Sequence, residues 1–293
     1  MHSLSLTVER GEVFGLLGHN GAGKSTALGI LLGQVYPDAG EAWIDGVSVQ
    51  RDRSRALRRV GAIFETPGFY DYLSGWRNLE IFSRYTARVS KREIEEAVEI
   101  VGLSDRIHDP VRVYSHGMRQ RLAVGQALLP APELVLLDEP TEGLDPEGIH
   151  EIRTLIQRLT RERGLTVLLS SHLLSEVEQL CTRVTILNQG RKIFDGRWGE
   201  LASDQKRVRL EVDDWERALA VLNGCAVAAE RGIVTLEPGA EVADLIERLV
   251  HTGVRVHAVE PVRRSLEQIY LELVQPLSPG AVAAAGEPGE KHH

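Results

Sequence analysis

The run that most constrains this chain is GHNGAGKS at residues 18–25, which fits the pattern Gly, four residues, Gly, Lys, Ser/Thr. An apolar stretch at 13–17 predicts a strand before it, and residues 24–32 have helical composition. Such a loop turns backbone N–H groups inward around phosphates, at a helix N-terminus whose dipole favours anions. The pattern predicts that Lys24 reaches the β- and γ-phosphates of a nucleotide and that Ser25 ligates Mg²⁺. The predicted nucleotide contacts from this loop are Gly18, Asn20, Gly21, Ala22, Gly23, Lys24, Ser25 and Thr26.

A phosphate-binding loop needs an acidic partner at the end of a buried strand. The apolar run at 134–137 is followed directly by Asp138 and Glu139. Asp138 is placed to hold Mg²⁺ directly or through water, and Glu139 to orient or deprotonate an attacking water. The sequence therefore predicts Asp138 as a metal ligand, with Glu139 and Lys24 as catalytic residues.

The first two hundred residues have the pattern of a parallel α/β sheet. Short apolar strands at 134–137 and 166–169 are separated by a helical stretch, and residues 66–130 look mostly helical. Leu4, Leu6 and Val8 alternate with polar residues, which predicts one more strand before the turn at residues 9–12. Residues 1–200 are therefore interpreted as one nucleotide-binding domain.

Composition changes after about residue 200. Strand-like segments at 207–212, 233–236 and 254–259 alternate with helix-like segments at 215–222, 242–250 and 264–274. This pattern predicts a small α+β domain over residues 205–275. Residues 276–293 are rich in Pro, Gly and Ala and are expected to be a disordered tail.

The charge balance argues against a nucleic-acid partner. The chain has 34 Lys and Arg against 42 Asp and Glu, a net charge of -8, whereas clamping a phosphate backbone needs a basic face. Two cysteines, Cys181 and Cys225, form no disulfide framework or metal-binding spacing and fit a reducing compartment. No apolar run approaches the roughly 20 residues that span a bilayer. We therefore expect a protein that reaches a membrane through a partner.

Further motifs resemble those of the ATP-binding cassette (ABC) ATPases over about residues 3–198. Residues 114–118, YSHGM, are similar to the ABC signature, whose usual form is Leu-Ser-Gly-Gly-Gln. Gly143, Leu144 and Asp145 resemble the D-loop, and His172 resembles the switch histidine. The resemblance implies a P-loop NTPase fold, in which a mixed-sheet core carries a helical subdomain at about 66–130.

The resemblance also implies how these elements act. Ser115 and the backbone N–H of Gly117, at a helix start, would bind the γ-phosphate of ATP held by a second ATPase subunit. Asp145 would join this nucleotide contact, and His172 would hydrogen-bond the γ-phosphate and help place Glu139. The implied cofactors are ATP and Mg²⁺. A homodimer is favoured over pairing with a sister subunit, because one chain holds all the catalytic residues.

Two departures from the family pattern carry expectations. Glu65 stands where the family usually has glutamine. Its carboxylate can still contact the nucleotide and Mg²⁺. Together with residues 66–70, Glu65 resembles the bacitracin-resistance type of exporter ATPase. Met1 lies 17 residues before Gly18, without the aromatic residue that normally stacks on adenine. Weakened discrimination between ATP and GTP is therefore expected.

The resemblance implies a cytoplasmic ATPase subunit, peripheral on the inner face of the cell membrane. It would power export of an antibiotic, peptide or lipid-like compound through a separate integral membrane permease. The aromatic residues at 69–76 suit either a permease contact or the packing of the helical subdomain itself. The alternative is a soluble ABC ATPase that acts on a ribosome, nucleic acid or assembly complex.

Overall fold

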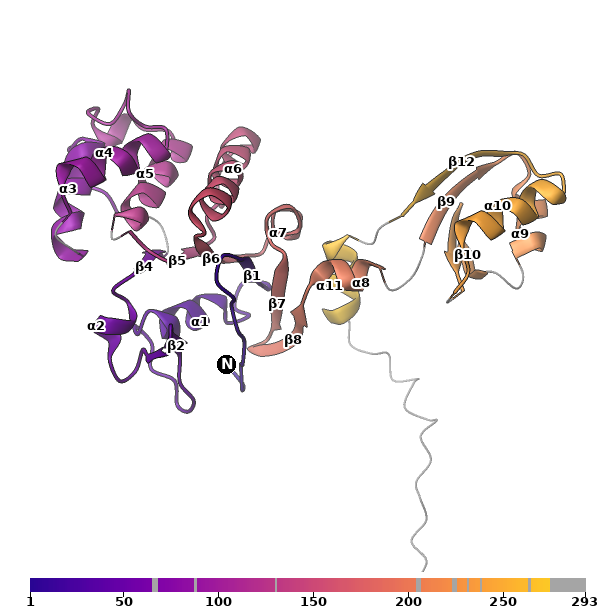
Figure 1. Ribbon diagram of the computed structural model, residues 1–293, viewed down its shortest axis with the longest axis horizontal. Helices are drawn as coiled ribbons and strands as arrows, with labels where there is room; N and C mark the ends of the chain where they lie inside the picture. Colours follow the sequence, from indigo (N-terminus) through magenta and orange to yellow (C-terminus); the bar gives the residue numbers. More distant parts are fainter. Residues whose placement is uncertain are drawn as a thin grey trace, which may run out of the picture. The chain divides into compact units, whose positions relative to one another are not determined.

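The computed structural model describes residues 1–64, 68–86, 89–129, 131–203, 207–222, 226–230, 232–237, 239–262 and 265–274 (Figure 1). The chain divides into two compact units, Met1–Gly199 and Glu200–His293, and each contains its own main sheet. The expected tail at 276–293 lies outside the described residues, as do Glu65 and Cys225.

The first unit is built on a six-stranded sheet in the order β4-β5-β6-β1-β7-β8. The first five strands in this order run parallel to their neighbours, and β8 runs antiparallel to β7. The strands are β1 (Val13–Leu17), β4 (Val60–Ile63), β5 (Leu134–Asp138), β6 (Thr166–Ser171), β7 (Arg183–Asn188) and β8 (Arg191–Gly196). A small hairpin pairs β2 (Trp43–Ile44) with β3 (Val47–Ser48). Because β5, β6 and β1 are parallel neighbours, their carboxyl ends meet at one edge of the sheet.

The central strand β1 is buried along its whole length and packs against helices on both faces. Phe14 contacts Leu28 of α1 (Lys24–Leu31) in one apolar cluster. Gly15 points to the opposite face, where an added Cβ would lie 2.8 Å from Val177 of α7 (Leu174–Leu180). Successive side chains of a strand alternate between faces, so this packing fixes the direction in which β1 delivers the glycine-rich loop.

Three helices gather beyond the β4 edge of the sheet: α3 (Gly75–Thr86), α4 (Lys91–Ile100) and α5 (His116–Leu128) (Figure 1). A capping box starts α4, in which the Ser90 and Glu93 side chains each accept a hydrogen bond from the other residue's backbone N–H. The remaining helical segments of this unit are α2 (Arg53–Ala56), the 3-10 turn η1 (Val111–Val113) and α6 (Pro146–Arg163). Helix α8 (Trp198–Ser203) follows β8.

Helix α5 is pressed onto β4 at a glycine. A Cβ built on Gly61 would lie 2.0 Å from the carbonyl oxygen of Ala127 and 2.9 Å from its carbonyl carbon. Both atoms belong to the backbone, so a larger residue could be accommodated only by moving the helix or the strand.

We expect Gly61→Ala to destabilise the first unit by about 3 kcal/mol, because overpacking against backbone cannot be relieved by a rotamer change. Gly199→Ala is the matched control, since nothing lies within 4 Å of its added Cβ. Urea denaturation followed by circular dichroism should show a lower midpoint for Gly61→Ala and an unchanged one for Gly199→Ala. Equal midpoints for the two variants would contradict the packing described.

The second unit has a four-stranded antiparallel sheet covered by two helices, and a further helix follows the last strand. Its elements follow in the order β9 (Arg207–Val212), α9 (Trp215–Leu222), β10 (Ala226–Glu230), β11 (Ile233–Leu236), α10 (Val242–His251) and β12 (Val256–Pro261), and then α11 (Leu266–Val274). The strand order β10-β11-β9-β12 with these crossovers is the split βαβ, or ferredoxin-like, topology. Its core joins one face of the sheet to both helices and contains Val208, Leu210, Ala218, Leu222, Val234, Leu236, Leu245, Leu249 and Val254.

The strand predicted at Leu4, Leu6 and Val8 is wrong. These residues are half-buried and pack against the apolar clusters of the first unit, but within the described part of the chain no strand pairs with them. Side chains satisfy part of the backbone of this segment instead. Lys192 donates to the Ser5 carbonyl oxygen, and Arg183 donates to the Thr7 carbonyl oxygen at 3.4 Å. The alternating pattern therefore indicates that one side of an extended segment is buried; it does not indicate that the segment pairs in a sheet.

Candidate functional site

The glycine-rich loop lies between β1 and α1, as its sequence predicts. Gly18 leaves no room for a side chain, because an added Cβ would lie 2.6 Å from the Leu187 carbonyl oxygen and 2.7 Å from the Ala22 Cβ. Gly23, the N-cap of α1, has a φ of 107°, in the region that favours glycine. The loop thus reaches its shape through glycines at two points, and the first backbone N–H groups of α1 are left for an anionic ligand.

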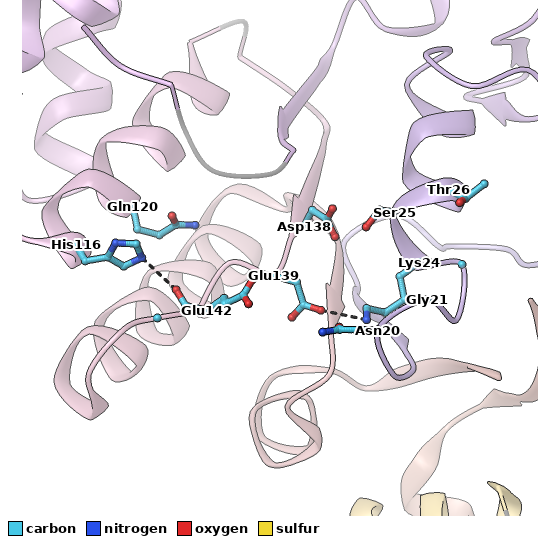
Figure 2. Close-up of a pocket in the computed structure, with 12 residues that line it drawn as sticks. Asn20, Gly21, Lys24, Ser25, Thr26, His116, Gln120, Asp138, Glu139 and Glu142 are labelled. Atoms are coloured by element: carbon cyan, nitrogen blue, oxygen red, sulfur yellow. Dashed lines mark hydrogen bonds and ion pairs between the residues drawn. The ribbon is translucent and has the colours of Figure 1, made fainter. Parts of the chain in front are cut away.

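Lys24 is buried at the base of this loop. Its Nζ donates to the Gly18 carbonyl oxygen at 2.8 Å and forms an ion pair with Glu139 Oε1 at 3.1 Å. Figure 2 shows the lysine side chain reaching from α1 toward the carboxylate at the end of β5. An ammonium group held in this way has its charge aimed at the space where the two strand ends meet the loop.

The end of β5 is held by Ser170 of the neighbouring strand β6. The Ser170 hydroxyl donates to Asp138 Oδ1, and the Glu139 N–H lies 3.2 Å from both the carbonyl oxygen and Oγ of Ser170. Glu139 has a φ of +47°, which is uncommon for a residue other than glycine. Strain of this kind persists where surrounding contacts fix the backbone, and it often marks a functional position.

His172 follows β6 and contacts the same glutamate. Its Nδ1 lies 3.0 Å from Glu139 Oε2, and its backbone N–H donates to that oxygen at 3.3 Å. One oxygen of the Glu139 carboxylate therefore faces Lys24 and the other faces His172. The structure brings together the three residues that the sequence predicts as catalytic.

Lys24, Asp138 and Glu139 border an open cavity of about 680 Å³. Its size lies within the range of about 300–1,000 Å³ usual for small-molecule sites. Figure 2 shows the lining residues, with the loop at one side, Asp138 and Glu139 near the centre, and α5 at the other side. The lining comprises Asn20, Gly21, Gly23, Lys24, Ser25, Thr26, His116, Gln120, Asp138, Glu139, Glu142 and Gly143.

Ser115 and Gly117 of the signature-like run lie beside the cavity, whereas His116 between them lines it. Ser115 is the N-cap of α5, and its Oγ accepts a hydrogen bond from the Met118 N–H at 3.2 Å. Asp145 caps α6 in the same way, accepting from the Gly148 N–H at 2.9 Å. A Cβ on Gly117 would lie 3.9 Å from the Gly148 Cα, so the two helix starts are neighbours. Ser115, Gly117 and Asp145 thus gather beside the cavity but do not line it.

Tyr114, which precedes this turn, anchors it to the helical group. Its hydroxyl donates to the Arg106 carbonyl oxygen at 2.8 Å, and a Cβ on Gly75 would lie 2.5 Å from the same hydroxyl oxygen. Burial, reinforced by the nearby charge of Asp109, raises the pKa of Tyr114. The tyrosine therefore stays neutral and acts as a packing residue.

Sequence reasoning missed several residues of the site. His116 and Gly143 were named only within the signature-like run and the D-loop, yet they line the cavity together with Gln120 and Glu142, and Ser170 orients the end of β5. A helical spacing of four places His116 and Gln120 on one face of α5, and this was the available signal. Glu65, predicted as a nucleotide and metal contact, lies outside the described residues.

The glycine-rich loop after β1 carries a buried lysine, and this lysine faces two carboxylates at the end of β5. This arrangement defines a P-loop nucleotide site. Comparisons with known proteins extend this class to a family. The ABC transporter family model matches residues 1–142. The ABC transporter ATP-binding protein YhcH of Bacillus subtilis, itself uncharacterized, is 43% identical over 272 residues, 92% of this chain and 89% of that protein. The bacitracin transport ATP-binding protein BcrA of Bacillus licheniformis is 40% identical over 220 residues, 75% of this chain and 72% of that protein.

Solved structures agree with this assignment. The structure of cbiO1 from Clostridium perfringens, part of the ABC transporter complex cbiONQ, matches with a TM-score of 0.63 and 26% identity, covering 69% of this chain and 83% of that one. An ATP-binding subunit of an ABC transporter matches with a TM-score of 0.59 and 31% identity, covering 68% and 83%. The chain belongs to the ATP-binding subunits of ABC transporters, so it is an ATPase that powers transport. The predicted P-loop NTPase fold and family are confirmed.

Within the described residues, no helix combines the length and the apolar character needed to cross a bilayer. ATPase subunits of this family work with membrane permease components.

Proposed function

We propose that this chain powers the export of an antibiotic, peptide or lipid-like compound through a separate permease. The observation that carries the proposal is that Glu139, which lines one cavity with Lys24 and the glycine-rich loop, pairs with Lys24 through one carboxylate oxygen and contacts His172 through the other. Two relatives support the direction and the class of compound, because they are named for bacitracin transport and linearmycin resistance.

The roles of the site residues follow from their geometry. The loop, with Gly18, Asn20, Gly21, Ala22, Gly23, Lys24, Ser25 and Thr26, would enclose the phosphates of ATP. Lys24 stabilises charge that develops on the transferred phosphoryl group, and Glu139 accepts a proton from the attacking water. His172 holds the Glu139 carboxylate in position through its Nδ1 contact.

The donor set also fits Mg²⁺. Asp138 and Ser25 line the same cavity and offer a carboxylate and a hydroxyl oxygen, the hard ligands that this ion takes together with phosphates and water. Ser170 orients the Asp138 carboxylate and leaves Oδ2 free of that bond. When bound, the ion supplies charge neutralisation between the phosphates; Glu65 is proposed as a further ligand.

We propose that the working unit is a dimer, with a homodimer favoured. Ser115, Gly117 and Asp145 are not among the residues that line the chain's own cavity, although His116 is, and this leaves the three residues available to the nucleotide of a second subunit. Although Ser115 Oγ accepts a bond from Met118, its O–H can still donate to a phosphate oxygen. The first turn of α5 adds its helix dipole at the same point.

An aromatic cluster at the start of the helical group is the proposed permease contact. Tyr70 stacks on Phe82 with ring centroids 5.9 Å apart, and Tyr72 lies edge-on to Tyr70 at 6.2 Å. Tyr72 is 72% exposed and Tyr70 is 43% exposed. Exposed aromatic side chains on a packed base are typical anchors of protein interfaces.

The test is affinity purification of the tagged chain from its native cells in mild detergent. We expect to recover one polytopic membrane protein at near-equal stoichiometry. This membrane protein should no longer be recovered with a Tyr70→Ser, Tyr72→Ser double variant. Tyr36→Ser is the matched control, because Tyr36 is 78% exposed and has no ring contact in that cluster. Recovery of ribosomal or assembly proteins alone would replace the exporter proposal with a soluble ABC ATPase.

The cellular location and the domain roles are part of the same proposal. The chain would lie in the cytoplasm, on the inner face of the cell membrane, held there by the permease. Residues 1–200 would form the ATP-binding domain, with a helical subdomain at about 66–130, and residues 205–275 an accessory domain. No contact with nucleic acid is proposed.

A further inference from the structure

His116 occupies the position at which the signature-like run departs from the family's usual glycine. It is the first residue of α5, and its side chain reaches the loop that follows β5. Its Nε2 lies 3.1 Å from the carbonyl oxygen of Glu142, an interaction drawn in Figure 2. A carbonyl oxygen only accepts hydrogen bonds, so Nε2 carries the proton and donates.

The imidazole ring is also packed over the next residue of that loop. A Cβ built on Gly143 would lie 3.4 Å from His116 Nε2, 3.8 Å from Cδ2 and 3.9 Å from Cε1. Gly143 has a φ of +72°, so the loop turns sharply under the ring. One hydrogen bond and one packing contact therefore fix the histidine against two consecutive residues of the loop.

The loop so held connects two functional points of the chain. It begins at Glu139 and ends at Asp145, and it consists of consecutive turns in which the Glu142 N–H donates to the Glu139 carbonyl at 3.1 Å. The Leu144 N–H donates to the Thr141 carbonyl at 3.3 Å. A displacement at Glu142 is thereby passed to the backbone of Glu139, one turn away.

The other end of the contact is the start of α5, which is also held on the side of the helical group. Tyr114, just before the helix, donates to the Arg106 carbonyl oxygen, and Arg119 in the first turn forms an ion pair with Asp71 at 2.7 Å. Neither contact reaches the loop that follows β5. The His116 hydrogen bond adds the link between the helix start and that loop.

We propose that His116 is a positioning residue for ATP hydrolysis, which holds the start of α5 in fixed register with the Glu139 loop. The inference rests on the proposed dimer, in which Ser115 and Gly117 face the partner's nucleotide and Glu139 serves the chain's own. The His116 hydrogen bond then joins, within one chain, a contact to one nucleotide and the carboxylate acting on the other. It is needed for turnover and not for binding of ATP to the loop.

The test compares two substitutions in the full chain. His116→Phe keeps a ring but loses the donor, and His116→Gln keeps an N–H donor on a side chain of similar reach. We expect His116→Phe to lower kcat about five- to tenfold, the effect of one positioned hydrogen bond, with the KM for ATP unchanged. His116→Gln should restore kcat to within about twofold. His251→Phe, at an exposed histidine of α10, is the matched control.

A second measurement follows the contact itself. Amide hydrogen exchange of residues 140–145 in the nucleotide-free chain should be faster in His116→Phe than in the wild type and normal in His116→Gln. Normal kcat in His116→Phe, or His116→Gln as slow as His116→Phe, would overturn the proposal. A wild-type activity that does not rise more than linearly with protein concentration would instead count against the dimer, while the exchange and kcat data still decide the role of His116.

Discussion

The Glu139→Gln chain is expected to bind ATP but to hydrolyse it about 100- to 1,000-fold more slowly than the wild type, which is the range for losing a general base. Glutamine keeps the shape of the side chain, and its amide oxygen can still face Lys24 Nζ, which lies 3.1 Å from Oε1 in the wild type. It cannot accept the proton of the attacking water. The expected result is therefore a trapped ATP-bound dimer, visible by size-exclusion chromatography with ATP and Mg²⁺.

Glu142→Gln is the control for this variant. Glu142 lines the same cavity, but its contact with His116 uses the main-chain carbonyl, which the substitution leaves in place. Phosphate release by Glu142→Gln should stay within about twofold of the wild type, as for substitutions that keep the structural contacts. Rapid hydrolysis by Glu139→Gln, or equal loss in both variants, would contradict the assignment of Glu139 as the base.

Lys24→Ala is expected to lose turnover by a different route. The ammonium group is buried and its two contacts, with Gly18 and Glu139, aim it into the cavity. Its removal withdraws the charge that would meet the β- and γ-phosphates, so kcat/KM should fall by about 100-fold or more. Unlike Glu139→Gln, this variant should also bind ATP more weakly, and titration with a fluorescent ATP analogue would separate the two effects.

Lys192→Ala provides the matched comparison, because Lys192 pairs with Asp195 on β8, away from the cavity lining. Its kcat/KM should match that of the wild type. If Lys24→Ala retained both affinity and turnover, the glycine-rich loop would not be the phosphate site, and the mechanism would fail at its first step.

The parts of the site that sequence could predict are those where spacing alone dictates backbone shape. Few other structures require this spacing of glycines at 18, 21 and 23, or an apolar run that ends in Asp138. The glycine-rich loop lies at the end of β1 and Asp138 at the end of β5, as expected. The segments at 207–212 and 215–222 also formed the predicted strand and helix. In each, the periodicity of apolar residues matches the burial.

The remainder depended on which segments meet in space. Leu4, Leu6 and Val8 alternate like a strand, yet alternation records burial of one side and carries no information on a pairing partner. Strand β8 was not predicted because it has no buried residue, and its place in the sheet comes from its partner β7. The contacts of Ser170 with Asp138 and of His116 with Glu142 join residues 32 and 26 positions apart, which no local pattern encodes.

The burial of Cys181 also could not be predicted from local sequence. The sequence indicates only that Cys181 belongs to no disulfide framework or metal-binding spacing, whereas the structure buries it at the junction of α7 and β7. This burial, with the nearby charge of Glu12, raises the pKa of Cys181 far above the usual value for a thiol. It therefore remains a packing residue without thiolate reactivity at neutral pH.

The ion pair between Lys24 and Glu139 gives the ammonium group a carboxylate partner on the side from which phosphate oxygens would approach. An incoming nucleotide has to offer Lys24 phosphate oxygens that replace the carboxylate, and the α-phosphate alone does not extend to that position. The site should thus discriminate by the length of the phosphate chain, binding di- and triphosphates, whereas monophosphates should be unable to displace the glutamate.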